Sequence, residues 1–235
     1  QVLASMGIYV FNTGKLLDLL ESGQEDDFGR DIIPNMLASC QVFAYPYVRF
    51  NRIEDYIYFT TEDGDREIRL EPRVRDSSYW RDVGTLDAYW NANMDLTGVD
   101  PYFNLYGTKW PIHTRQVLAP PAKFIFSNER PEGFRVGKAL DSLVAPGCIV
   151  SGIVRNSVLS HNVIVRSWTT VDESVVCDDV VIGRHSKIKK AIIDKNNNIP
   201  PGTEIGYNPG EDRKRFTVTS RGIVVVPKGY FGGME

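Results

Sequence analysis

The fold of this chain is decided by residues 153–205, which read IVRNSVLSHNVIVRSWTTVDESVVCDDVVIGRHSKIKKAIIDKNNNIPPGTEI. Counted from Val154 to Ile205, an apolar residue returns after 5, 6, 6, 5, 6, 6, 5, 6 and 6 positions. An α-helix does not keep such steps on one face, and a β-meander alternates at every second residue. Three steps make one coil, so the spacing predicts a parallel β-helix.

Two rows of apolar residues follow this spacing, and we expect both to fill the interior of the coils. The interior row consists of Val154, Leu159, Val165, Val171, Val176, Ile182, Ile188, Ile193, Ile199 and Ile205. The companion row consists of Ile153, Val158, Ile164, Val175, Val181 and Ile192.

Composition narrows the classes of partner. The 235 residues suffice for one large or two ordinary domains, and 42% of them are hydrophobic. A net charge of -3 argues against nucleic acid, and no stretch has the apolar length of a membrane helix. Cys40, Cys148 and Cys177 form no C-x-x-C pair, so neither a disulfide framework nor a zinc site is expected. We therefore expect a cytoplasmic protein with small molecules or protein subunits as partners, and a buried Cys148.

The segment ahead of the repeat predicts α/β structure. A buried strand is expected at Val2–Phe11, a further strand at Val42–Tyr47, and helices near Leu16–Leu20 and from Arg30 onward. Because a buried strand needs neighbours on both sides, the opening strand after Gln1 leads us to expect a start within a domain.

Residues 51–76 have a different character. Tyr56–Thr61 and Glu67–Glu71 alternate on either side of a polar turn, which predicts an exposed, charged hairpin. Helical spacing returns over Thr85–Leu96, and a proline-bearing stretch then leads to the coils.

The segment Tyr79-Trp80-Arg81-Asp82-Val83-Gly84-Thr85 carries residue types that suit a sugar phosphate site. An aromatic ring can stack on a pyranose, and a carboxylate can hold a divalent metal that neutralises phosphate charge. The plainer interpretation is that Asp82 or Thr85 caps the following helix and that Trp80 belongs to a core. Asp27 and Phe28 are similarly ambiguous, since acids in a first helical turn often serve the helix dipole. Ser5 can bond a ligand or simply fill a sheet.

Four segments in order resemble the bacterial glucose-1-phosphate adenylyltransferases: A-S-M-G-I-Y-V-F, D-F-G-R-D-I-I-P, Y-W-R-D-V-G-T and the β-helix. The resemblance covers nearly the whole chain. It implies an α/β plus all-β protein, in which a partial nucleotidyltransferase (Rossmann-like) domain precedes a left-handed parallel β-helix. The implied boundaries are 1–118 for the nucleotidyltransferase part, 119–138 for a linker and 139–235 for the β-helix.

The resemblance also implies an activity. Family members join ATP and α-D-glucose 1-phosphate to give ADP-glucose and pyrophosphate for glycogen synthesis, with Mg²⁺ as cofactor. Ser5, Asp27, Phe28 and Trp80 are implied to contact glucose 1-phosphate, and Asp82 to be the catalytic metal carboxylate. The family's glycine-rich nucleotide loop, first metal carboxylate and sugar-phosphate lysine lie upstream of Gln1. We therefore expect this portion of the enzyme to be inactive alone.

The family further implies a homotetramer regulated by anionic metabolites. Asp179, Lys195 and Lys228 resemble effector contacts, and lysines suit an anionic ligand. Ordinary solvated coil surface is the alternative interpretation of these three residues.

Two other functions stay open. A paralogue that keeps the fold and loses the chemistry would be a noncatalytic regulatory subunit, against which Asp82 argues. A hexapeptide-repeat acyltransferase would use His161 or His185 as a base, but it leaves the segment ahead of the coils unexplained.

Overall fold

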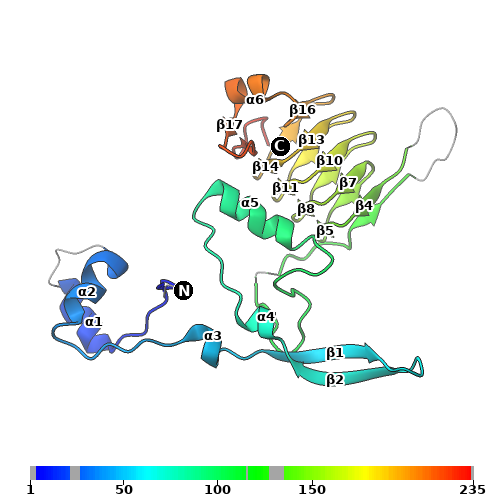
Figure 1. Cartoon of the computed structure of the whole chain (residues 1–235). Helices are drawn as coiled ribbons and strands as arrows, with labels where there is room; N and C mark the ends of the chain where they lie inside the picture. The colour runs from blue at the N-terminus through cyan, green and yellow to red at the C-terminus, as the bar shows by residue number, and fades with distance from the viewer. Residues whose placement is uncertain (1–3, 22–26, 115, 127–134, 234–235) are drawn as a thin grey trace. The chain divides into compact units, whose positions relative to one another are not determined.

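The computed structural model describes residues 4–21, 27–114, 116–126 and 135–233 (Figure 1). The chain divides into two compact units, residues 1–52 and residues 53–235. Each unit is described by itself.

The first unit is helical in its described part. Helix α1 spans Thr13–Glu21, a single π-type turn η1 spans Phe28–Ile32, and the short helices α2 and α3 span Ile33–Met36 and Tyr47–Phe50. The helix expected near Leu16–Leu20 is therefore confirmed as α1. The helix expected from Arg30 onward is present as η1 and α2, with Asp27 as its N-terminal cap.

Two strands predicted in this unit are wrong. Residues 4–11 and 42–46 are extended without any strand pairing, and Val10 is 99% exposed. A strand exists only through hydrogen bonds to a neighbour, and the described part of this unit offers none. The apolar character of these segments predicted burial, but Ile8, Val10 and Phe43 are exposed in the described structure.

The second unit begins with the predicted hairpin. Strand β1, Glu54–Thr60, pairs antiparallel with β2, Arg66–Pro72, so that Tyr56 lies opposite Leu70 and Tyr58 opposite Ile68. All of β2 except Glu71 is exposed, which confirms the exposed hairpin. Helix α4, Val74–Ser77, follows directly, and helix α5, Leu86–Asp95, confirms the helix expected over Thr85–Leu96.

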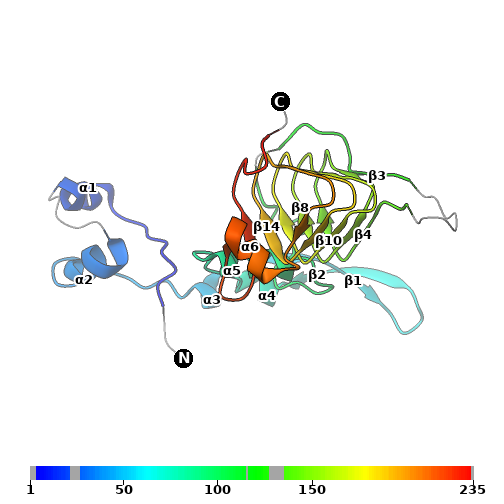
Figure 2. The ribbon, with the colours of Figure 1, turned by 90° about the horizontal axis from the view of Figure 1, so that it is seen from above.

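The described residues 123–126 and 135–226 form the left-handed parallel β-helix, whose coils are stacked one on the next (Figures 1 and 2). Three sheets line its sides. The first contains β4 (Lys138–Leu140), β7 (Ile153–Arg155), β10 (Thr170–Asp172), β13 (Lys187–Lys189) and β16 (Glu204–Ile205). The second contains β5 (Leu143–Val144), β8 (Val158–Leu159), β11 (Val175–Val176), β14 (Ala191–Ile193), β18 (Val224–Val226) and β17 (Thr217–Val218). The third contains β3 (Lys123–Phe124), β6 (Ile149–Val150), β9 (Ile164–Val165), β12 (Val181–Ile182) and β15 (Asn198–Ile199).

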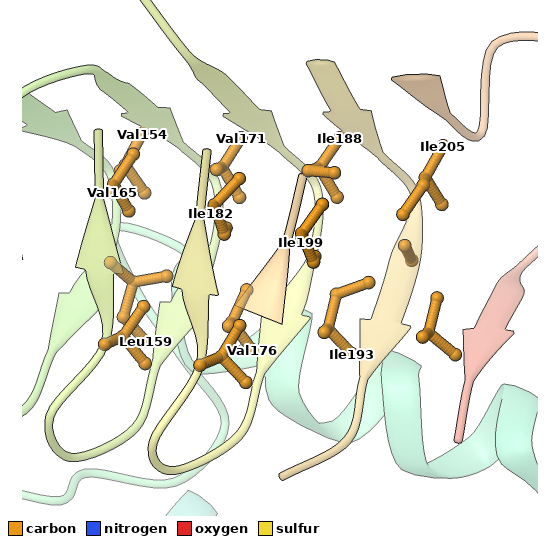
Figure 3. Packing of buried hydrophobic residues seen from close by; sticks show 14 of the residues in the cluster. Val154, Leu159, Val165, Val171, Val176, Ile182, Ile188, Ile193, Ile199 and Ile205 are labelled. Carbon is orange, nitrogen blue, oxygen red and sulfur yellow. The ribbon is translucent and has the colours of Figure 1, made fainter. Parts of the chain in front are cut away.

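The interior row fills the coils as predicted (Figure 3). Each of its members is at most 1% exposed, and the register places Val154 beside Val171 and Val171 beside Ile188. Successive coils therefore superpose after seventeen residues. Cys148 belongs to the same core and is 1% exposed, which confirms its expected burial.

The companion row is not part of this core, so the prediction that it fills the interior is wrong. Each companion residue precedes an interior one within a strand, and successive side chains of a strand point to opposite faces. Burial varies within this row: Val175, Val181 and Ile192 are buried, whereas Ile153, Val158 and Ile164 are only partly buried.

Buried serines form a column at one corner of the coils. Ser174 N donates to Ser157 Oγ at 3.1 Å, and Ala191 N donates to Ser174 Oγ at the same distance. Both hydroxyls are fully buried and donate in turn to carbonyl oxygens of their own coil. Each coil is thereby tied to the next by a side chain as well as by the ladder.

The last coil is closed by helix α6, Pro209–Arg215, and the segment after it. Asp212 in this helix is buried and accepts from Gly206 N at 3.1 Å, while Phe216 packs its ring 5.0 Å from Tyr230 and 6.1 Å from Phe231. The interior is thus covered at this end. Among the residues that the structure describes, no helix has the length and apolar character needed to cross a bilayer.

Candidate functional site

In the first unit, the structure brings three predicted sugar contacts together. Ser5 Oγ lies 2.9 Å from Tyr9 Oη, and the Tyr9 and Phe28 rings stack with centroids 6.0 Å apart. Asp27 directly precedes Phe28, and a Cβ placed at Gly29 would lie 3.6 Å from Tyr9 Oη and 3.5 Å from Asp27 Oδ1. A carboxylate, two hydroxyls and aromatic rings therefore meet around one glycine.

Asp27 owes its position to the start of the turn η1. Its Oδ1 accepts from Gly29 N and from Arg30 N, both at 2.8 Å. The backbone hydrogen bonds from Arg30 and Gly29 lower the pKa of Asp27, because they stabilise the charged form. The carboxylate is exposed and stays ionised at neutral pH, so it can accept hydrogen bonds from a polyhydroxylated ligand.

Tyr9 was missed by the sequence interpretation. It follows Ser5 by four residues, and the chain bends between them at Gly7, whose φ is 70°. The contact between the two hydroxyls therefore could not be read from strand alternation.

In the second unit, Trp80 and Asp82 lie in the loop that leads into α5. Asp82 Oδ1 accepts from Gly84 N at 2.9 Å, whereas Thr85 Oγ1 accepts from Ala88 N at 3.1 Å. Thr85 is therefore the helix cap, and Asp82 shapes the turn before it. Trp80 is 47% exposed, so its interpretation as a core residue is wrong.

The loop is fixed to α5, and α5 is fixed to the β-helix. Arg81 Nη1 donates to Asn91 O at 3.4 Å. Trp90 Nε1 donates to Glu173 O at 2.9 Å, and Thr219 Oγ1 donates to Asp87 Oδ1 at 2.8 Å. The loop that carries the exposed Asp82 carboxylate is thus held in place by α5, which is itself hydrogen-bonded to the β-helix.

Asp82 is one oxygen donor of the type that Mg²⁺ prefers, and a hexacoordinate ion requires several more. No group of three or more His, Cys, Asp or Glu side chains suited to a metal was found within residues 4–21, 27–114, 116–126 and 135–233. The donor chemistry fits, and the remaining ligands would have to come from substrate, water or other residues.

The three predicted effector residues gather at one corner of the last coils. Lys195 Nζ lies 3.7 Å from Asp178 Oδ2, and Gly229 N donates to Lys195 O at 3.1 Å, which brings Lys228 beside Lys195. Asp179 has a positive φ of 57° and accepts from Asn162 Nδ2 at 3.0 Å. Asp and Asn adopt this backbone region more readily than other non-glycine residues, so Asp179 also has a structural role.

Asp178 is a second residue that the sequence interpretation missed. It accepts from His161 N at 3.1 Å, and His161 Nδ1 lies 3.6 Å from the same carboxylate oxygen. His161, Asp178 and Lys195 are separated by seventeen residues each, so the coil period itself was the signal. His185, the other histidine considered as a base, stacks on Trp168 with ring centroids 4.9 Å apart.

Comparisons with known proteins agree with this layout. The Nucleotidyl transferase family model matches residues 1–98, and the model for the GlmU-like, C-terminal hexapeptide matches residues 120–226. The chain therefore joins part of a nucleotidyl transferase domain to a hexapeptide β-helix.

Similar curated proteins narrow the class. The chain is 46% identical to the glucose-1-phosphate adenylyltransferase of Rhodopirellula baltica over 234 residues, which cover 97% of this chain and 47% of that protein. For the Methylococcus capsulatus protein of the same name the identity is 46%, covering 97% of this chain and 49% of the relative. For the Koribacter versatilis protein the values are 43%, 98% and 50%. Over nearly its whole length the chain is similar to these glucose-1-phosphate adenylyltransferases, and it spans about half the length of these curated relatives.

Proposed function

We propose that this chain works as part of a glucose-1-phosphate adenylyltransferase, which converts ATP and α-D-glucose 1-phosphate to ADP-glucose and pyrophosphate for glycogen synthesis in the cytoplasm. In this proposal residues 1–118 belong to the catalytic domain and 139–235 to the β-helix. The segment 119–138 links them and also contributes β3 to the third sheet of the β-helix. The observation that carries the proposal is the grouping of Ser5, Tyr9, Asp27 and Phe28 around Gly29.

The sugar phosphate is held by groups of complementary chemistry. Hydroxyls of Ser5 and Tyr9 and the carboxylate of Asp27 exchange hydrogen bonds with sugar hydroxyls, while the Phe28 ring covers an apolar face. Trp80, half-exposed in the second unit, is by itself a further candidate contact for glucose 1-phosphate. These contacts orient the phosphate oxygen that attacks the α-phosphorus of ATP as pyrophosphate leaves, so the chemistry depends mainly on alignment.

Asp82 would hold Mg²⁺, which neutralises phosphate charge during nucleotidyl transfer. Its Oδ1 is oriented by Gly84 N, and the support from α5 keeps the loop in place without using Asp82 as a cap. Because Thr85 caps the helix, the Asp82 carboxylate is not needed as a cap and can bind a metal ion.

Regulation and assembly belong to the same proposal. Asp179, Lys195 and Lys228 contact an anionic metabolite, and the protein is a homotetramer. The regulatory part is supported by the position of Lys228 next to Lys195, because two ammonium groups suit an anion, which would displace Asp178 from Lys195.

The test measures pyrophosphate release from ATP and glucose 1-phosphate with Mg²⁺, in this chain and in a longer chain extended upstream through a glycine-rich nucleotide loop. We expect turnover only in the longer chain, and a loss of at least about 100-fold for Asp82→Asn, since a charged metal ligand becomes neutral. Thr97→Ala is the matched control on the far side of α5. Silence of the longer chain would favour the noncatalytic regulatory subunit, and an undiminished Asp82→Asn enzyme would remove Asp82 from the metal site.

A further inference from the structure

The β1–β2 hairpin has no role in the proposed catalysis, and its two faces differ. The register places Tyr56, Tyr58, Ile68 and Leu70 on one face, where they are 48%, 72%, 59% and 49% exposed. An isolated two-stranded hairpin is at best marginally stable in water, and gains stability from a third strand or a covering surface. A covering partner would remove these exposed aromatic and branched side chains from water.

Among the described residues, the segment that follows α5 contacts the hairpin through β1. On β1, Asp55 accepts from Thr108 N at 3.0 Å and from Thr108 Oγ1 at 2.9 Å, and the Lys109 ammonium lies 4.7 Å from the Tyr56 ring centroid. Strand β2 pairs with β1 alone among the described strands. Its outer edge therefore presents backbone N–H and C=O groups that suit another strand.

The charges of β2 decide which strand fits. Glu67 and Arg69 lie on the face opposite to Ile68, where Arg69 Nη2 contacts Glu67 Oε2 at 2.6 Å. If a second β2 pairs antiparallel about a two-fold axis through Ile68, Glu67 of each copy lies opposite Arg69 of the other. Ile68 then meets Ile68, and the four apolar residues of each hairpin form one continuous face. Opposite charges directly across a strand pair are stabilising.

Other positions of the two-fold axis between the two β2 strands are excluded by the same charge and face pattern. An axis through Arg69 places two arginines opposite each other, and an axis between two residues turns the apolar faces to opposite sides. In the favoured register Asp65 falls opposite Glu71, a like-charged pair that limits the pairing to Arg66–Leu70.

We propose that the outer edge of β2 is a self-association surface, on which the β2 strand of a second copy of this chain completes a four-stranded antiparallel sheet centred on Ile68. The surface is self-complementary, as a two-fold interface requires. Its occupant follows from the charge pattern and does not depend on the function proposed above.

The position of the axis gives a direct test by disulfide trapping. In a Cys40→Ser background, Ile68→Cys places two thiols opposite each other at about 4.5–5.5 Å between Cα atoms, within the range that a disulfide spans. Tyr58→Cys is the matched control: it shares the face and is more exposed, but the two copies lie three strand spacings apart, roughly 14 Å. Mild oxidation followed by non-reducing electrophoresis should yield covalent dimer for Ile68→Cys and little for Tyr58→Cys.

Charge reversal then identifies the register. Added to Ile68→Cys, either Glu67→Arg or Arg69→Glu should lower the rate of dimer formation about tenfold, because each turns two attractive pairs into repulsive ones. The double change should restore it. Both side chains are half-exposed, so none of these variants removes a core residue, and far-UV circular dichroism serves as the check.

Three outcomes overturn the proposal. The first is equal trapping at residues 58 and 68, which is the signature of random collision. The second is charge variants that trap as fast as the parent. The third is a disulfide in the Ile68→Cys variant that peptide mapping shows to join the new thiol to a residue outside β2, since another surface then occupies the edge.

Discussion

The first unit and the β-helix use apolar residues of similar character with opposite results. In the first unit, Ile8 is 75% and Phe43 85% exposed, while every residue of the interior row in the β-helix is at most 1% exposed. Each coil packs its interior side chains against the next coil, which lies only seventeen residues away in the sequence. The repeat therefore supplies its own packing partners. The segments of the first unit need partners that the described residues of this unit do not provide.

The largest expected effect is the loss of stability on truncating an interior residue of the β-helix, compared with an exposed residue of the first unit. Ile182→Ala should lower the free energy of unfolding of the β-helix by about 2–5 kcal/mol, because it opens a cavity in a fully buried row. Val10→Ala, at a 99% exposed position, should change it by less than about 0.5 kcal/mol. Urea unfolding followed by circular dichroism measures both. Equal losses would show that Val10 is buried in solution and that the contrast does not hold.

This contrast also explains which features the sequence predicted. Every residue of the interior row was predicted correctly, because the seventeen-residue period can be read from neighbouring stretches of the sequence. The strands at Val2–Phe11 and Val42–Tyr47 were wrong because strand formation depends on neighbours that a local pattern does not specify. The companion row was wrong for a simpler reason: an apolar residue next to an interior one must face outward in a strand.

The residues of the candidate site were likewise predictable where a local motif named them and not where only contacts in the fold did. Ser5, Asp27 and Phe28 came from motifs, and the structure brought them together, but Tyr9 was identified only by its contacts with Ser5 and Phe28. Asp178 lies one coil period from His161 and from Lys195, and its contacts with both confirm what that period could have indicated. The choice between Thr85 and Asp82 as helix cap depends on hydrogen bonds that spacing alone left open.

A smaller loss of stability is expected on removing a buried serine hydroxyl that links two coils. Ser174→Ala should destabilise the β-helix by about 1–3 kcal/mol, because Ala191 N loses its acceptor inside a fully buried corner. Ser220→Ala, at an exposed turn, is the control and should be close to neutral. Thermal unfolding of both variants compares them. If Ser174→Ala were neutral, the coils would be held by packing and the backbone ladder alone.

The hairpin lies between these two extremes, since a carboxylate rather than a core anchors its base. Burial of Asp55 by itself would raise its pKa, but hydrogen bonds from Tyr56 N and from Thr108 outweigh burial and lower the pKa below its ordinary value of 3.8. The folded state therefore binds the proton less readily than the unfolded state does, and the anchor contributes stability above about pH 4. That contribution is lost as the pH falls below 3.8 through the lower folded pKa.

Amide exchange of Thr108 and Tyr56 measures the anchor, since both N–H groups donate to this carboxylate. Beyond the usual dependence of exchange on pH, their protection should decline at acidic pH in the parent chain and be reduced already at neutral pH in Asp55→Asn. An amide that replaces the carboxylate keeps the shape but loses the charge that strengthens these hydrogen bonds. Protection in Asp55→Asn equal to that of the parent at neutral pH would show that the hairpin is held by its strand pairing and not by the carboxylate.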